Sequence, residues 1–200
     1  DKCWELINER GNDIVIFNQF AEFGNPIWHY HLTGSAALEV FDSIKTPRSR
    51  FAAWVSATGS AGTIAAGDHI KKFHPQARII ASEALQCPTL LNCGFGGHRI
   101  EGIGDKHVPW VHNARNTDAV VAVDDEHCMR LMRVFNEPEG HEYLRKSGIS
   151  EEVIKNLELL GISSISNVLS AIKTAKFFEL DENDVLFTCL TDSAELYQSR

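Results

Sequence analysis

The sequence predicts an α/β protein, a three-layer sandwich with a mostly parallel central sheet. Two observations lead to this prediction. Short and nearly continuous apolar runs, typical of strands covered on both faces, alternate along the chain with segments of helical periodicity. Their order, strand then helix then strand, is that of successive βαβ units. With 200 residues, the chain is long enough for one sizeable domain with its own core.

The predicted strands are apolar runs rich in β-branched and small residues. They cover residues 13–17 (DIVIF), 51–57 (FAAWVSA), 77–84 (ARIIASEA), 119–123 (AVVAV) and 185–190 (VLFTCL). A run this short that is apolar throughout favours a buried strand over an amphipathic helix. The first run is therefore also expected to be buried.

Helical periodicity fills the intervals between these runs. The predicted helices cover residues 33–44, 62–73, 124–135, 150–160 and 166–178. Thr33 is the expected N-cap of the first of them, since its hydroxyl can accept from the free amides there. Residues 136–150 lack a clear period, and we interpret them as an irregular insertion.

Composition excludes several classes of function. A net charge of −8 disfavours a nucleic-acid or anionic-membrane partner, and no apolar run approaches the length of a bilayer span. The five cysteines are odd in number, irregularly spaced and without a C-x-x-C pair, so we expect no disulfide framework and a reducing cytoplasm. His29 and His31 have no evident third partner, so no metal site is predicted.

The most chemically informative segment is the turn A-T-G-S-A-G-T at residues 57–63, between a predicted strand and a predicted helix. Small residues let backbone amides converge on an anion, and the following helix adds the positive end of its dipole. Hydroxyls of Ser60 and Thr63 could add donors. The predicted phosphate-binding residues are Gly59, Ser60, Ala61, Gly62 and Thr63. The alternative is a plain tight turn without a ligand.

Five motifs in order resemble those of one family. They are Q-F…N-P…H-Y…T-G at residues 19–34, the turn at 57–63, H-R-I-E-G-I-G at 98–104, G-I-S-S at 161–164 and D-S-A-E-L-Y at 192–197. Together they resemble the C-terminal portion of the fold-type II pyridoxal-phosphate (PLP) enzymes, in the cysteine synthase/cystathionine β-synthase family. The resemblance implies the large domain of that fold.

The resemblance also implies a cofactor and its contacts. PLP acts as an electron sink while the protein supplies binding and electrostatics. Gly102 and Gly104 would let the backbone pass close to the cofactor; ordinary loop glycines are the alternative. Ser163 would face the pyridine nitrogen and, being neutral, would leave it unprotonated; a helix N-cap is the alternative. Ser193 would support the pyridine end, or be a turn residue.

Some positions depart from the family pattern. Ala61 stands where the family's phosphate turn has a glycine, a mild change if the backbone there has a negative φ. Ile165 and Ala194 replace glycines that follow the paired serines and the D-S pair. These changes are typical of a divergent branch and weaken any inference about a specific substrate.

The resemblance implies PLP-dependent β-replacement or β-elimination on small, serine-like amino acids, as in a cysteine synthase-like lyase or transferase. No lysine has the sequence context of the family's Schiff-base lysine, so the catalytic residue is unknown. We expect an incomplete chain that is inactive by itself and a homodimer when complete. Residues 1–20 would be a remnant of the small domain and residues 21–200 the large domain. The alternative is a non-catalytic domain that binds an anion or a partner.

Overall fold

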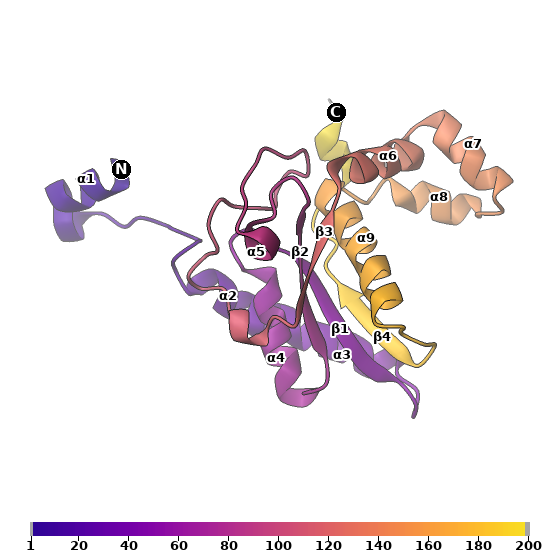
Figure 1. Cartoon of the computed structure of the whole chain (residues 1–200), viewed down its shortest axis with the longest axis horizontal. Coiled ribbons are helices and arrows are strands. Elements are labelled where there is room, and N and C mark those ends of the chain that lie inside the picture. The colour runs from indigo at the N-terminus through magenta and orange to yellow at the C-terminus, as the bar shows by residue number, and fades with distance from the viewer. Residues whose placement is uncertain (1, 199–200) are drawn as a thin grey trace.

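The structure is a computed structural model that describes residues 2–198. In this part of the chain the sheet has four strands, all parallel, in the order β3-β2-β1-β4. Their bounds are Arg50–Ala57 (β1), Arg78–Ala84 (β2), Ala119–Val123 (β3) and Asp184–Thr188 (β4). The predicted α/β architecture with a parallel sheet is confirmed (Figure 1).

Helices occupy the intervals between the strands. The α-helices are Lys2–Arg10 (α1), Gly24–Trp28 (α2), Gly34–Ile44 (α3), Ala66–Phe73 (α4), Thr89–Asn92 (α5), Asp125–Asn136 (α6), Pro138–Lys146 (α7), Glu151–Leu157 (α8) and Ile162–Phe177 (α9). A π-helical turn, His29–Thr33, joins α2 to α3, and a 3₁₀ turn, Thr63–Ala65, precedes α4. None of the described helices is long and apolar enough to cross a membrane.

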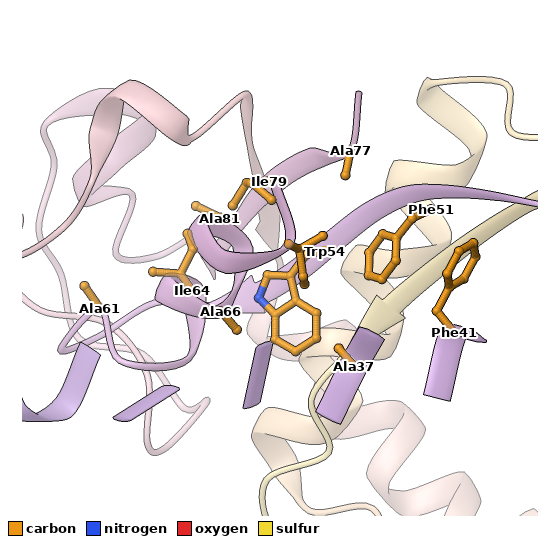
Figure 2. Close-up of a cluster of buried hydrophobic side chains, with 11 residues drawn as sticks. Ala37, Phe41, Phe51, Trp54, Ala61, Ile64, Ala66, Ala77, Ile79 and Ala81 are labelled. Atoms are coloured by element: carbon orange, nitrogen blue, oxygen red, sulfur yellow. The ribbon is translucent and has the colours of Figure 1, made fainter. Parts of the chain in front are cut away.

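Helices cover the sheet on both faces, which makes three layers. On one face, α3 and α4 enclose an aromatic cluster that includes Phe41, Phe51 and Trp54 (Figure 2). A register shift between Phe51 and Ala53 lets Phe51 and Trp54 reach this same face of β1. On the other face, α9 contacts all four strands, and α6 packs beside it.

Much of the buried face of helix α9 is polar, whereas the buried face of an ordinary amphipathic helix is apolar. Ser163, Ser164, Asn167 and Ser170 are all buried there. The Asn167 side chain accepts from the Ala57 amide at 2.8 Å and donates to the Cys189 carbonyl at 2.8 Å. It therefore ties α9 to the ends of β1 and β4, where the candidate site lies.

Three expectations about elements are wrong. Residues 13–17 form no strand, and the side chains of Val15 and Phe17 are 76% and 95% exposed, because no described strand pairs with them. Residues 136–150 are largely helical, since Pro138 starts α7 in the first-turn position that suits proline. Thr33 caps nothing: it has helical dihedral angles within the continuous run from α2 to α3.

Candidate functional site

A cavity of about 550 Å³ lies beside the residue 57–63 turn, where strand β1 ends. Segments far apart in sequence line it. The lining residues are Gln19, Phe20, Asn25, His29, Ala57, Gly59, Ser60, Ala61, Gly62, Thr63, Gly102, Ile103, Gly104, Ser163, Asn167, Thr191 and Asp192. All the predicted cofactor residues are among them except Ser193, which precedes the 3₁₀ turn Ala194–Tyr197.

The turn exposes backbone donors to this cavity. Thr58 anchors its start, because both the amide and the hydroxyl of Thr58 donate to the Ser82 carbonyl, at 2.8 and 3.1 Å. The amides of residues 59–62 donate to no other described residue. Unpaired amides in a turn that lines a cavity, just before a helical segment, could bind an anion there.

Ala61 has a backbone φ of +59°, in the left-handed region. Ala61 stands where the family pattern has a glycine. Because its φ is positive, this replacement is strained, and the mild change expected for a negative φ does not apply. A Cβ in this region costs about 1–2 kcal/mol. Ala61 is nevertheless buried, and its methyl group packs in the core cluster under the turn.

We expect Ala61→Gly to raise the free energy of unfolding by up to about 1 kcal/mol, because relief of the left-handed strain exceeds the ~0.8 kcal/mol from the buried methyl group. Urea denaturation measures this change. Ala66→Gly is the matched control, since Ala66 is equally buried but has φ −58° at the start of α4. That variant should lose stability. A loss of similar size in both variants would contradict the prediction.

Gly62 leaves room for the Asn25 side chain, and its own φ of −71° is one that any residue can adopt. A Cβ at this position would lie 2.6 Å from Asn25 Oδ1. The Asn25 amide in turn donates to Ser60 Oγ at 3.0 Å, which leaves the hydrogen of Ser60 available to a ligand. The hydroxyl of Thr63 instead pairs with Ser56 Oγ at 2.6 Å.

The second backbone segment of the site is the loop at Gly102 and Gly104. Both glycines have positive φ, +82° and +79°, so an L side chain at either position would be strained. The Gly104 amide donates to the Thr58 carbonyl at 2.6 Å, which holds the loop against the turn. A Cβ on Gly59 would have its nearest neighbour, the Gly104 nitrogen, at 3.6 Å. Backbone of this loop therefore lies directly against backbone of the turn.

Opposite the turn, Ser163 lies in the first turn of α9. The N-cap of this helix is Gly161, so the N-cap alternative for Ser163 is wrong. Its Oγ is 2.5 Å from Thr191 Oγ1 and 3.2 Å from Asp192 Oδ1. Ser163 is 5% exposed and reaches the cavity together with these two side chains.

Several cavity residues were not among the predicted site residues. Asn25, His29 and Asp192 belong to motifs that carried the resemblance, so their motif membership was a usable signal. Asn167 had none beyond being a polar residue in a helical pattern. Burial lowers the pKa of His29, whose Nδ1 lies 2.9 Å from Thr33 Oγ1. Across residues 2–198 no three potential metal ligands lie close enough together to hold an ion.

Known proteins with similar sequences are cysteine synthases. The chain is 29% identical to cysteine synthase B of Campylobacter jejuni over 200 residues, which are 100% of this chain and 58% of that protein. It is 29% identical to cysteine synthase of Staphylococcus aureus over 182 residues, 90% of this chain and 51% of the relative. The chain thus spans about half the length of these relatives. No protein-family model matches it.

Solved structures agree. A hydrogen sulfide-producing enzyme of Fusobacterium nucleatum superposes with a TM-score of 0.77 and 26% identity, covering 99% of this chain and 53% of that one. A mutant of this enzyme was solved with an α-aminoacrylate intermediate. O-Acetylserine sulfhydrylase isoform 3 of Entamoeba histolytica superposes with a TM-score of 0.78 and 25% identity, covering 100% and 52%. The resemblance to the cysteine synthase family is confirmed.

Proposed function

We propose that this chain binds pyridoxal 5′-phosphate in the 550 Å³ cavity and takes part in β-replacement or β-elimination on small, serine-like amino acids. One observation carries the proposal. The turn, the Gly102–Gly104 loop and Ser163 are separated in sequence, yet they line one cavity. The likeness to cysteine synthases in sequence and in fold supports the same chemistry.

The side chains and amides present fit such a cofactor. The free amides of residues 59–62 and the Ser60 hydroxyl would hold the phosphate, since charge-assisted hydrogen bonds to an anion are strong. Ser163 would meet the pyridine nitrogen across the cavity. When bound, the cofactor supplies the electron sink for loss of the β-substituent. The chain's own residues would position it.

The remaining parts of the proposal concern the whole protein. Residues 1–20 would belong to a small domain and residues 21–200 to the large one. The exposed side chains of Val15 and Phe17 support this division, because such apolar surface favours association with another part. We propose that the complete protein is a homodimer in the cytoplasm. The free thiols of all five cysteines suit a reducing compartment.

A second candidate function is a non-catalytic domain that retains the anion site. The observation that favours it is that no lysine lies among the residues lining the cavity in the described part of the chain. This candidate function requires only that the chain binds phosphate, without any preference for the pyridine ring. The two functions therefore differ in which part of the ligand contributes to affinity.

We expect pyridoxal 5′-phosphate to bind and to change tryptophan fluorescence. Trp54 is a suitable reporter, because its indole nitrogen donates to the Thr63 carbonyl at 3.1 Å, directly behind the turn. Pyridoxal without the phosphate should bind at least tenfold more weakly, since it makes no contact with the amides; a factor of ten corresponds to about 1.4 kcal/mol. Equal affinity for the two compounds would contradict the proposal. Inorganic phosphate that binds as tightly as the cofactor would support the non-catalytic domain.

A further inference from the structure

A second cavity, of about 350 Å³, lies among helix α2, helix α4 and residues 110–117. We propose that it is a binding site for a small organic ammonium compound with an aromatic or apolar body. Asp68 would pair with the ammonium group. The rings of Phe23, Tyr30 and Trp110 would contact that group and the carbon atoms attached to it. This site goes beyond the proposed function, because it needs neither the cofactor nor the cavity proposed to hold it.

The second cavity is distinct from the proposed cofactor cavity. Ala61 is the one described residue that lines both of them. Ile64 and Ala65, in the 3₁₀ turn that follows, line the second cavity alone. An occupant would therefore contact the residue 57–63 turn at Ala61 and leave the 550 Å³ cavity open. A volume of about 350 Å³ lies in the range of sites for small molecules.

Three aromatic side chains from different segments line this cavity. Phe23 directly precedes α2, Tyr30 lies in the π-helical turn, and Trp110 belongs to the loop before β3. The rings of Phe23 and Trp110 meet edge to face, with centroids 5.5 Å apart. The indole nitrogen of Trp110 donates to the Ala21 carbonyl at 2.9 Å, which holds the ring in place although it is 72% exposed. Aromatic faces attract organic cations.

Asp68 is the one carboxylate among the described residues that line the second cavity. Its Oδ1 accepts from the side-chain amides of Asn113 and Asn116, at 3.1 and 2.6 Å. Its Oδ2 accepts from no described residue, and Asp68 takes part in none of the ion pairs of residues 2–198. A carboxylate oxygen without a partner, next to apolar side chains, favours a cationic donor.

The basic side chains nearby do not fill this role. On α4, Lys71 pairs with Asp118 at 2.8 Å. Lys72 Nζ lies 6.0 Å from the centroid of the Tyr30 ring, but Lys72 does not line the cavity. His112 does line it, and burial lowers the pKa of His112 more than the charge of Asp68 raises it. His112 is therefore neutral near pH 7 and places no positive charge in the cavity.

The charge of the ligand decides which compounds fit. A carboxylate would be repelled by Asp68, and an uncharged compound of the same shape would take water from Oδ2 without replacing it by a charged donor. An ammonium group donates hydrogen bonds to the carboxylate and is attracted by the aromatic faces. The net charge of −8 favours any cation over any anion, so the test needs a variant that changes the net charge elsewhere.

The test compares phenethylamine, phenethyl alcohol and hydrocinnamate, which share a phenyl group on a short chain and differ in charge. Of the four tryptophans, all in the described residues, Trp110 alone lines this cavity, so its indole N–H signal in NMR spectra reports binding there. Trp110→Phe identifies that signal. We expect phenethylamine to shift it saturably and to bind roughly fivefold or more tightly than the alcohol, as for a hydrogen bond with a charged partner. Hydrocinnamate should not shift it.

Asp68→Asn separates the charge from the shape of the site. The asparagine keeps an oxygen that can accept from Asn113 and Asn116, and replaces the free Oδ2 with an amide. Affinity for phenethylamine should fall by roughly fivefold or more, whereas affinity for the alcohol should not fall. Glu39→Gln, on the exposed surface of α3, removes the same charge elsewhere and should bind the amine as wild type does. The indole signal of buried Trp54 checks that each variant is folded.

The comparison of the three compounds uses the wild-type chain, so it does not depend on the folding of a variant. The proposal is overturned if phenethylamine causes no saturable shift of the Trp110 signal, or if the alcohol binds as tightly as the amine. It is also overturned if Asp68→Asn binds the amine as tightly as Glu39→Gln does. Loss of amine binding in Asp192→Asn and not in Asp68→Asn would place the amine in the cofactor cavity instead. No cofactor enters these titrations, so each of these results leaves the proposed function standing.

Discussion

Replacing Gly62 with valine is expected to weaken phosphate and pyridoxal 5′-phosphate binding by roughly fivefold or more. The new Cβ would lie 2.6 Å from Oδ1 and 2.7 Å from Nδ2 of Asn25, so the whole amide must move away. Its hydrogen bond to Ser60 Oγ is then lost, and the turn that carries the free amides is displaced. Such overpacking costs on the order of 1–3 kcal/mol, which corresponds to roughly 5–150-fold in affinity. Titration of Trp54 fluorescence with pyridoxal 5′-phosphate, and its competition by inorganic phosphate, measure the two losses.

Gly97→Val is the matched control for this substitution. A Cβ on Gly97 would meet no atom within 4 Å, and this glycine has no positive φ. The control should keep wild-type affinity for phosphate, while both variants should remain folded by circular dichroism. If Gly62→Val binds phosphate as tightly as Gly97→Val does, the turn is not part of the binding site.

The sheet could be predicted because its signals are local. The strands β1, β2, β3 and β4 were expected within one or two residues of their ends, since short apolar runs between turn residues suit strands that are covered on both faces. The position of the residue 57–63 turn was equally readable, because a run of small residues directly follows an apolar strand pattern. The parallel pairing then follows from the helices between the strands.

Other elements depend on contacts that a local pattern does not contain. Residues 13–17 have the apolar pattern of a strand, but a strand forms only where a neighbour can accept its hydrogen bonds. Helix α9 begins at Ile162, ahead of the predicted residue 166, because its first turn has a polar face buried against Thr191 and Asp192. Apolar periodicity cannot detect such a turn.

The candidate site likewise combines residues that a local sequence pattern indicates with contacts that only the folded chain shows. Residues 59–63 were predicted from their own sequence, and Ser163 from the family resemblance. The hydrogen bond between Ser163 and Asp192 joins residues 29 positions apart, so only the folded chain reveals it. Ser193 was predicted beside the pyridine end, yet it is Asp192, its neighbour in sequence, that lines the cavity. Both residues lie beyond the end of β4 at Thr188, in a segment whose path the motif alone does not give.

No single lysine of the 200-residue chain is expected to be labelled stoichiometrically when pyridoxal 5′-phosphate is added and the imine is reduced with borohydride. None of the lysines in the described residues lines the cavity. Lys106 lies closest in sequence to the Gly104 loop, but it is exposed to solvent. The aldehyde should therefore react slowly with surface amines, and peptide mass mapping should find labels spread over many lysines.

The informative comparison is between labelling and binding in the same sample. Excess inorganic phosphate should displace the cofactor from the turn and restore Trp54 fluorescence, yet leave the scattered lysine labelling unchanged. Lys106→Arg should remove the label at that one position. Cofactor binding should stay unchanged, and total labelling should fall only by the amount that Lys106 contributed. The prediction would be contradicted by a stoichiometric adduct at one lysine that disappears when phosphate is added or when Gly62 is replaced by valine. In that case one of these lysines reaches the bound aldehyde, and the chain itself carries the catalytic amine.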